Sequence, residues 1–424
     1  MRLAYRLLTY LLLPVYAGYW FFRGIVNRSY WDRFGQRLGQ DYPYLPTGCI
    51  WVHAVSVGEV QAAVPLIRAL SGMFSNRHIL VTTVTPTGAE RVRLLFEDTV
   101  KHCYIPFETP NAVTSFFNSV NPQIALIMET EIWPNLYHEC GEREIPLILV
   151  SARISPKSVG TYQKFLPLFR ETLSHGIVIA AQSEKDADRF RSLGAAQERT
   201  WVTGNIKFDV ELPEDLEIRG EELRRDNFEG RPVWVAASTH DREEEQVLHA
   251  HSIVRQRFPD ALLVLIPRHP ERFPSVRAML HRSGRRFISR TEGLPCASDV
   301  EVFLADTMGE VPLFYAAANV AFVGGTLVPV GGHNLLEPAA LGKPVVTGPH
   351  LFNTQDIANM FEKLGASITV NNAGQLGEAV ADLFANPETA MDIGNRGLEI
   401  LQLNRGSLDR LLTLLEPLVN KAKD

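Results

Sequence analysis

Two series of alternating strand-like and helix-like segments constrain the fold of this chain more than any other feature. From residue 49 onward, short apolar runs rich in β-branched residues alternate with amphipathic helix patterns. The predicted strands of the first series are Cys49 to Val55, Ile79 to Thr85, His102 to Phe107, Ile124 to Met128, Leu147 to Ser151, Ile177 to Ala181 and Thr200 to Thr203. Because most of these runs have no polar face, they are typical of parallel strands that helices cover on both sides.

An acidic segment separates the two series. Residues 211–230 hold eight acids against three arginines, and they include Pro213, so residues 210–231 are predicted to be a solvated connection. The predicted strands of the second series are Val233 to Ala237, Leu262 to Ile266, Phe287 to Ser289, Val300 to Leu304, Val320 to Val323 and Val345 to Thr347.

The length and composition fit two domains. A chain of 424 residues that is 46% hydrophobic can bury two cores. We therefore predict an α/β protein with two Rossmann-like, doubly wound domains. They would span residues 41–209 and 232–424, the second with a helix-rich C-terminal part, and would face each other across a cleft at the carboxyl ends of their strands.

The first 40 residues differ from the rest of the chain. Residues 7–22 are uncharged, contain four Tyr and Trp side chains and are flanked by Arg6 and Arg23, as in segments that contact a membrane interface. Their sixteen residues fall short of the roughly 20 that a spanning helix needs. A short spanning helix with snorkelling arginines and a helix lying in the interface both remain open. In either case we predict an N-terminal membrane-anchoring helix within residues 1–40, with the arginines after it on the cytoplasmic side.

Several protein classes do not fit the sequence. The net charge of −6 argues against a nucleic acid as partner. The four cysteines form no CxxC pair, which argues against a zinc ribbon and a disulfide framework. The chain has no P-loop motif, no HExxH and no GxGxxG after its first strand. The single loop histidines, at positions 53, 240, 269, 333 and 350, are expected to cap or pack rather than to bind a metal.

Charged side chains of the first domain follow three predicted strands. Glu59 opens a helix after the first strand, where burial would raise its pKa and let it accept a proton from a hydroxyl. It could equally serve only the helix dipole. Glu129 and Glu131 would share one strand face, or, if the strand has ended, divide between cleft and solvent. Lys207 is either a surface lysine or a cation that meets a phosphate or a carboxylate.

The second domain carries four such loops. They are residues 238–240, 267–270, 306–310 and 331–338. The last follows a strand and the glycine turn 324–325, and a helix is predicted to begin at Asn334 with Glu337 in its first turn. Free backbone N–H groups at such turns and helix starts attract phosphate, Arg268 suits an anionic group, and Glu337 could accept hydrogen bonds from ribose hydroxyls. The set predicts a pocket for a sugar nucleotide.

Eight motifs of the chain resemble those of a known family. In order they are HAVSVGE, TPTGAERV, METEIWPN, SAR, TGNIKFD, IPRHPERFP, ADTMGE and FVGGTLVPVGGHNLLEP. They resemble the bacterial 3-deoxy-D-manno-octulosonic acid (Kdo) transferases across nearly the whole chain. One departure is Leu335, where a proline is common in the family, which leaves the exact start of the helix open.

The resemblance implies a GT-B glycosyltransferase that transfers Kdo from CMP-Kdo to a lipid A precursor, tetraacyldisaccharide bisphosphate. The reaction is an early step of lipopolysaccharide core assembly at the cytoplasmic face of the inner membrane. Glu59 would be the general base, and Glu129 and Lys207 would support the transition state. The residues implied to bind CMP are Pro267, Arg268, Met308, Gly309, Glu310, Asn334, Leu335, Leu336 and Glu337. Neither a metal nor a cofactor is implied.

Elementary chemistry agrees with this implication. CMP is a good leaving group, and in-line displacement would invert the anomeric carbon while Glu59 removes the hydroxyl proton. The arginines that follow the N-terminal segment, up to Arg37, are candidates for holding the phosphates of the acceptor. Two rivals remain: a nucleotide-sugar epimerase of the same two-domain build and a non-catalytic membrane scaffold.

Overall fold

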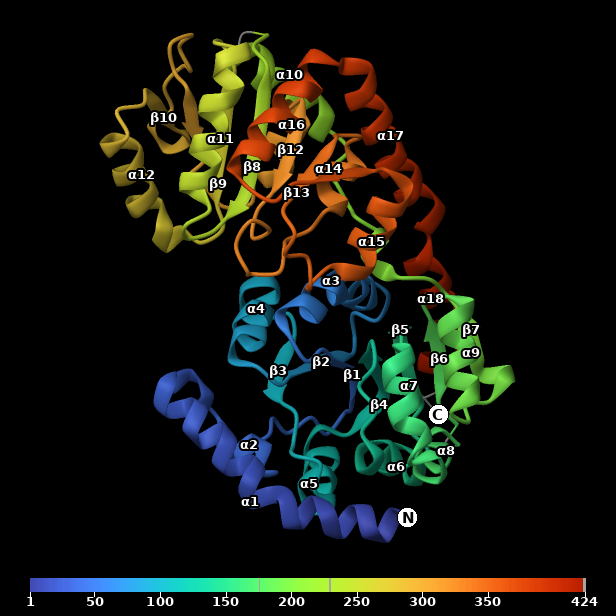
Figure 1. Ribbon diagram of the computed structural model, residues 1–424. Helices are drawn as coiled ribbons and strands as arrows, with labels where there is room; N and C mark the ends of the chain where they lie inside the picture. The colour runs from blue at the N-terminus through green and yellow to red at the C-terminus, as the bar shows by residue number, and fades with distance from the viewer. Residues whose placement is uncertain (175, 229, 422–424) are drawn as a thin grey trace. The chain divides into compact units, whose positions relative to one another are not determined.

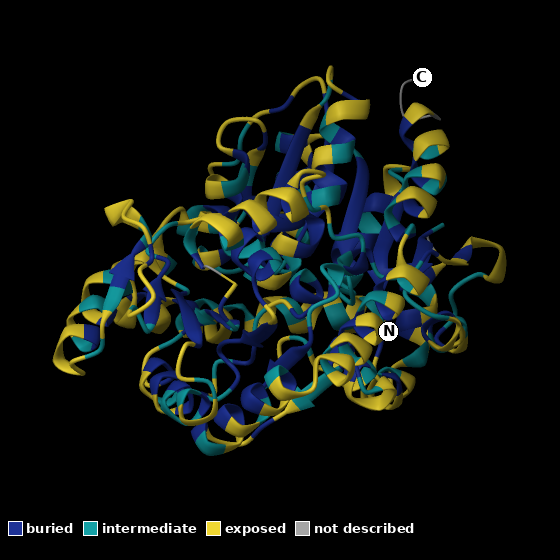
Figure 2. Cartoon of the chain, turned by 90° about the horizontal axis from the view of Figure 1, so that it is seen from above, coloured by how far each residue is buried: buried dark blue, intermediate teal, exposed yellow. Residues whose placement is uncertain are grey.

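The computed structural model describes residues 1–174, 176–228 and 230–421. The chain divides into two compact units (Figure 1). Unit 1 comprises Met1–Asp209 and Asn404–Asp424, and unit 2 comprises Val210–Leu403. Each contains one parallel sheet most of whose strands are buried, while the outer faces of the helices are exposed (Figure 2).

The sheet of unit 1 has seven parallel strands in the order β3-β2-β1-β4-β5-β6-β7. Its strands are β1 (Cys49–His53), β2 (His78–Thr83), β3 (Lys101–Tyr104), β4 (Pro122–Met128), β5 (Leu147–Ala152), β6 (Val178–Ala181) and β7 (Thr200–Val202). All seven were predicted within a few residues. The strand order reverses between β1 and β4, and such a switch point opens a crevice at the carboxyl edge of a doubly wound sheet.

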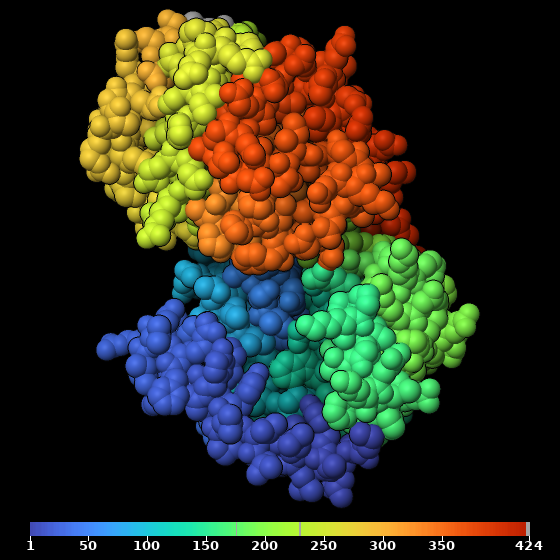
Figure 3. All heavy atoms as spheres, in the orientation of Figure 1, coloured from blue at the N-terminus to red at the C-terminus, as the bar shows by residue number. Residues whose placement is uncertain are grey.

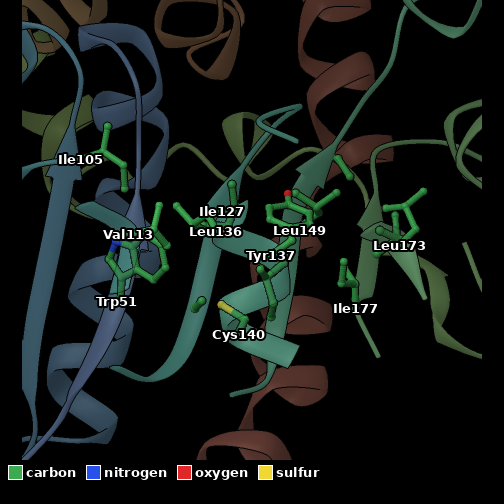
Figure 4. Close-up of a cluster of buried hydrophobic side chains, with 14 of the residues drawn as sticks. Trp51, Ile105, Val113, Ile127, Leu136, Tyr137, Cys140, Leu149, Leu173 and Ile177 are labelled. Carbon is green, nitrogen blue, oxygen red and sulfur yellow. The ribbon is translucent and has the colours of Figure 1, made fainter. Parts of the chain in front are cut away.

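Helices cover both faces of this sheet. They are α1 (Arg2–Val26), α2 (Phe34–Arg37), α3 (Val57–Met73), α4 (Pro86–Phe96), α5 (Pro110–Val120), α6 (Pro134–Glu142), α7 (Pro156–Gln163), α8 (Leu166–Leu173), α9 (Glu184–Ser192) and α18 (Ser407–Lys421), with short 3-10 turns η1 (Arg28–Trp31), η2 (Gln197–Arg199) and η3 (Ile206–Phe208). Side chains alternate along β1: Trp51 joins the core beneath α5 and α6, whereas Ile50 and Val52 join the core beneath α3 and α4 (Figure 4). This alternation explains why the run is apolar throughout.

The sheet of unit 2 also has seven parallel strands, in the order β10-β11-β9-β8-β12-β13-β14. Its strands are β8 (Val233–Thr239), β9 (Leu262–Pro267), β10 (Phe287–Ser289), β11 (Val302–Leu304), β12 (Val320–Val323), β13 (Val345–Thr347) and β14 (Ser367–Thr369). Its helices are α10 (Leu216–Asn227), α11 (Glu244–Arg257), α12 (Phe273–Arg282), α13 (Val311–Ala317), α14 (Leu336–Ala340), α15 (Gln355–Leu364), α16 (Ala373–Ala385) and α17 (Pro387–Asn404), with 3-10 turns η4 (Pro270–Arg272) and η5 (Arg290–Glu292). The order reverses between β8 and β12.

The predicted acidic connection, residues 210–231, is largely helical and belongs to unit 2. Helix α10 packs on α13 so closely that a Cβ on Gly220 would lie 2.5 Å from the Cβ of Ala316. Leu216 and Leu223 lie on the same face of α10 and join the core of unit 2. The prediction of a solvated linker is wrong because the acids occupy the outer face of a helix whose inner face is apolar.

The end of the chain also departs from the prediction. Residues 404–424 were expected in the second domain, yet they belong to unit 1. The carboxylate of Asp209 accepts hydrogen bonds from the backbone N–H groups of Gly406 at 2.6 Å and Leu408 at 2.7 Å, which fixes the start of α18. Leu411 and Leu415 are then buried in the core shared with α3 and α4.

Residues 1–40 form part of unit 1 as well. One side of α1 packs on the unit: the hydroxyl of Tyr5 donates to Glu108 at 3.3 Å, Tyr16 meets Phe107 edge to face, and Trp20 is buried. Other side chains of α1 stand at the surface of the unit (Figure 3). These exposed apolar residues include Leu3, Leu7, Leu11, Val15, Phe22 and Val26. Within the described part of the chain, no helix is both long and apolar enough to cross a membrane.

Arg37 was a candidate for holding acceptor phosphates, but it is buried. Its guanidinium lies 4.4 Å from the ring centroids of both Trp20 and Tyr104 and donates to the carbonyl of Val84 at 2.6 Å. Burial lowers its pKa to about 10. Arg37 therefore stabilises the contact between α1 and the sheet and is not available to a ligand.

Replacing a buried side chain of α18 should destabilise unit 1, although α18 lies at the far end of the sequence. We expect Leu411→Ala to cost about 2–5 kcal/mol of unfolding free energy, because it removes methyl groups from a packed core. Leu403→Ala is the matched control, since Leu403 is 77% exposed on α17. Urea unfolding of the full chain, with hydrogen exchange to locate the change, measures the effect. Equal stability of both variants would contradict the placement of α18.

Candidate active site

Glu59 lies at the carboxyl end of β1, in the first turn of α3. Its Oε2 accepts a hydrogen bond from the backbone N–H of Val55 at 2.8 Å, so the carboxylate folds back over the end of its own strand. Burial, with smaller contributions from the charges of Glu129 and Glu131, raises the pKa of Glu59 to about 8, although the N–H of Val55 and the charge of Lys207 act to lower it. A carboxyl group with this pKa can change protonation state near neutral pH, as a general base must.

Glu129 follows β4, the strand next to β1 at the switch point, and is ionised. Lys207 Nζ lies 2.7 Å from its Oε1, and Arg153 Nε lies 2.8 Å from its Oε2. Burial alone would raise its pKa, but the two cations outweigh burial and lower it. The backbone of Glu129 has φ +56°, an unusual conformation for a residue with a side chain. This conformation changes the direction of the chain directly after β4.

Glu131 agrees with neither of its predicted placements. Strand β4 ends at Met128, so Glu129 and Glu131 do not share a strand face. Glu131 is partly buried rather than solvated, its Oε2 accepts a hydrogen bond from Trp133 Nε1 at 2.7 Å, and burial raises its pKa. The negative charge of Glu131 therefore contributes to the raised pKa of Glu59.

Lys207 is held on the short turn η3 after β7. The backbone N–H of Lys207 donates to Asn205 Oδ1 at 3.0 Å, and the preceding residue, Ile206, is buried and donates its N–H to Ser151 Oγ at 3.2 Å. These contacts direct the ammonium group to Glu129. The structure thus joins Lys207 to Glu129, and the charges of both act on Glu59. Arg153 was not predicted, although it follows β5 in the SAR motif.

The loops of unit 2 after β9 and β11 hold Pro267, Arg268 and Met308 to Glu310. Pro267 ends β9, and the N–H of Arg268 donates to the carbonyl of Thr239 at 3.0 Å. Met308 is 56% exposed after β11. Gly309 has φ +84°, and Glu310 is held by both Arg290, with nitrogens 2.9 and 3.2 Å from its oxygens, and Thr307. The hydrogen bond from Arg290 lowers the pKa of Glu310.

The motif at residues 334–337 begins a short helix two residues later than predicted. Asn334 Oδ1 accepts from the N–H of Leu336 at 3.0 Å, and its Nδ2 donates to Glu337 Oε1 at 3.2 Å. Helix α14 therefore starts at Leu336, with Glu337 in its first turn. Leu335 and Leu336 are fully buried, so neither presents its side chain to a ligand, and the N–H of Leu336 is already bound by Asn334.

The glycine turn after β12 does not offer its N–H groups to a phosphate, contrary to the prediction. The buried carboxylate of Glu243 already accepts from Gly325 at 2.7 Å, Thr326 at 3.0 Å and Leu327 at 2.9 Å. It also accepts from the N–H of His240 at 3.2 Å, which links the loops after β8 and β12. This role was not predictable from the sequence, because Glu243 lies within a run of charged residues, 241–245.

Three histidines expected to be isolated lie together in unit 2. His240 Nε2 and His333 Nε2 are 2.7 Å apart in parallel rings, and the ring of His269 lies 5.4 Å from that of His240. Burial, together with neighbouring charge that includes Arg268, lowers the pKa of His240 to about 4 and that of His333 to about 3. Both rings are therefore neutral near pH 7.

Each half of the chain matches the model of a known protein family. Residues 32–210 match the family model described as 3-deoxy-D-manno-octulosonic-acid transferase (kdotransferase). Residues 231–399 match the model described as glycosyl transferases group 1. Among solved structures, UDP-GlcNAc 2-epimerase from Neisseria meningitidis bound to UDP-GlcNAc is similar in fold, with a TM-score of 0.51 and 16% identity over 87% of this chain and 99% of that one.

Curated relatives match over nearly their whole length. A 3-deoxy-D-manno-octulosonic acid transferase of Haemophilus influenzae is 40% identical over 92% of this chain and 93% of its own. Another, of Bordetella pertussis, is 35% identical over 91% of this chain and 90% of its own. The two parallel α/β units, the group 1 match and these relatives agree with a GT-B glycosyltransferase. The chain belongs to the family of 3-deoxy-D-manno-octulosonic acid transferases.

Proposed function

We propose that this enzyme transfers Kdo from CMP-Kdo to a lipid A precursor, tetraacyldisaccharide bisphosphate, with Glu59 as the general base. The family gives the transferred sugar, and the motifs of the chain resemble those of the bacterial lipid A-specific members. The observation that carries the base assignment is the Glu59 carboxyl group, whose pKa burial raises to about 8 and which lies within the electrostatic reach of Glu129 and Lys207.

In the proposed reaction, the ionised Glu59 accepts the proton of the acceptor hydroxyl. The hydroxyl oxygen then bonds to the anomeric carbon of Kdo while the bond from that carbon to the phosphate oxygen of CMP breaks. CMP leaves with the electron pair, and attack from the opposite side inverts the anomeric carbon. Lys207 and Arg153, which both contact Glu129, supply positive charge that favours the negative charge developing on the reacting groups.

Unit 2 is proposed to bind the donor. The loops after β9, β11 and β12 end at the carboxyl edge of its sheet, where doubly wound folds bind nucleotides. Residues 267–268, 308–310 and 334–337 are the proposed CMP ligands, with Glu337 toward the ribose. Asn334 orients the Glu337 carboxylate through their hydrogen bond at 3.2 Å. An epimerase of similar build would convert a sugar nucleotide without an acceptor, so incubation with CMP-Kdo and the lipid A precursor separates the two reactions.

Removing the base should abolish transfer but leave donor binding intact. We expect Glu59→Gln to lower kcat by at least a thousandfold, since it cannot accept the proton, while Kd for CMP changes less than twofold. The measurement is transfer from CMP-Kdo to the lipid A precursor by mass spectrometry, together with calorimetric titration of CMP. Turnover within tenfold of wild type, in a folded variant, would refute Glu59 as the base.

The rate of transfer should follow the ionisation of Glu59. Because the base works only when deprotonated, kcat/KM should rise tenfold per pH unit up to about pH 8 and then level. Glu131→Gln removes a charge that raises the pKa of Glu59, so it should move this profile to lower pH. A profile centred near pH 4.5, or one unmoved by Glu131→Gln, would contradict the proposed electrostatics.

The stability of the folded protein should fall as pH rises, whereas the rate of transfer rises. The folded pKa of Glu59 lies above its ordinary value, so its contribution to stability is present at low pH and is lost as pH rises through about 8. Glu59→Gln, which stays neutral, should therefore gain in Tm over wild type between pH 5 and pH 9. A Tm difference that is constant over this range would show that Glu59 ionises freely in the folded protein.

We further propose that α1 lies in the inner-membrane interface, on the cytoplasmic face. Leu3, Leu7, Leu11 and Val15 recur every four residues and are 64–74% exposed, while the opposite side of α1 packs on unit 1. An exposed apolar stripe of this length is typical of a helix that lies in a lipid surface. The exposed Arg23 and Arg28 at its end favour anionic lipid headgroups.

Charges placed in the apolar stripe should release the enzyme from membranes. We expect Leu7→Glu/Leu11→Glu to lower sedimentation with anionic phospholipid vesicles at least tenfold, yet to keep transfer to a detergent-dispersed acceptor. Leu94→Glu is the matched control, because Leu94 is 64% exposed on α4, outside the stripe. Equal vesicle binding by both variants would rule out α1 as the contact.

A further inference from the structure

Three of the histidines of unit 2 lie in loops that follow three different strands of one sheet. His240 follows β8, His269 follows β9, and His333 lies in the long loop after β12. We call His240, His269 and His333 the histidine cluster. The loop glycine Gly325 makes room for it: a Cβ there would lie 3.2 Å from His333 Nε2 and 3.4 Å from His240 Cδ2. The absence of a side chain thus lets the two parallel rings approach the backbone.

The pairing of the two rings leaves a hydrogen-bond donor available. Since His240 Nε2 and His333 Nε2 are 2.7 Å apart, one nitrogen donates and the other accepts. The ring that accepts at Nε2 carries its own proton on Nδ1 when it is neutral. The neutral pair therefore has one Nδ1–H group for a further acceptor, and a protonated pair has two. Because these N–H groups are donors, they suit the oxygen atoms of an anion.

Two arginines and four carboxylates lie around the histidine cluster, and most of them already contact other groups. Within residues 1–174, 176–228 and 230–421, no carboxylate forms an ion pair with Arg268, whose charge reaches His240 and His333. Arg272 is neutralised by Asp241 at 2.9 Å and Glu244 at 3.0 Å. Glu243 is saturated by backbone N–H groups, and Glu271 lies 4.0 Å from His269 Nδ1. Arg268 is thus the cation left for a ligand beside the cluster.

Other donors of unit 2 are less able to meet a phosphate. The N–H groups of the turn after β12 bind Glu243. Helices α13 and α14 have only seven and five residues, so their dipoles are small. The loops after β8, β9 and β12 end at the same edge of the sheet, next to the switch point between β8 and β12. The imidazoles and Arg268 therefore supply the polar hydrogens and the charge at this edge.

We propose that the histidine cluster and Arg268 form the site for the phosphate of the cytidine nucleotide, with His240 and His333 as a hydrogen-bonded pair that donates to its oxygens. This inference rests on the proposed function, because it assigns the part of the donor that the pair would contact. As the bond to Kdo breaks, negative charge develops on the phosphate oxygen of the leaving group. These donors stabilise that charge.

The test compares CMP with cytidine, which lacks the phosphate. In the full chain, His240→Phe and His333→Phe keep an aromatic ring but remove its donors. We expect each to weaken CMP binding by tenfold or more, as loss of a charge-assisted hydrogen bond does. Cytidine binding, measured by calorimetry at millimolar concentration, should change less than twofold. His281→Phe is the control, since His281 is exposed on α12 and packs on Phe287.

Each result has a distinct meaning. If wild type does not bind CMP, the donor site of the proposed function fails and this inference fails with it. If wild type binds CMP and both variants bind it within twofold of wild type, the inference alone is wrong. Equal loss of CMP and cytidine would also overturn it, because the pair would then shape the site without contacting phosphate. His269→Phe, at an exposed position, replaces any variant that does not fold and should weaken CMP binding severalfold.

Discussion

The free-energy cost of burying a carboxylate determines which contacts form at the carboxyl edges of both sheets. A buried acid is stable only when cations or N–H groups surround it, and it therefore fixes whatever supplies them. In unit 1, Glu129 after β4 binds Arg153 after β5 and Lys207 after β7. A single carboxylate thus connects three loops that are far apart in sequence. Glu59, in the first turn of α3 after the neighbouring strand β1, forms no ion pair with a cation among the described residues, and burial raises its pKa.

Unit 2 uses the same principle with backbone donors. Glu243 accepts from three consecutive N–H groups after β12, in the way that an anionic ligand would. The turn that looks most suited to phosphate is thereby filled by the protein itself. The rigid loop that results carries His333 toward His240, so that polar hydrogens at this edge come from side chains rather than from the glycine backbone. Side-chain donors differ from backbone donors in one respect: they can take up protons.

Sequence patterns predicted the strands better than the contacts between loops. Strands covered on both faces are apolar throughout, so thirteen of the fourteen were predicted; β14 was missed because its three residues include Ser367 and Thr369 and are partly exposed. The meeting of Glu59, Glu129 and Lys207 was predictable, since carboxyl ends of parallel strands converge. The roles of Arg153 and Glu243 were not, because each depends on groups that only tertiary packing brings near. Likewise, α10 was mistaken for a linker because its charged face dominates its composition.

The path of the chain has a consequence for how the protein is made. Unit 2 is inserted between Asp209 and Asn404, so the first Rossmann domain is discontinuous and receives its last helix from the end of the sequence. During translation, unit 2 can close its core while the earlier domain still exposes the apolar surface that awaits α18. The domain with the proposed catalytic base is therefore completed only after unit 2 and then α18 have been synthesised.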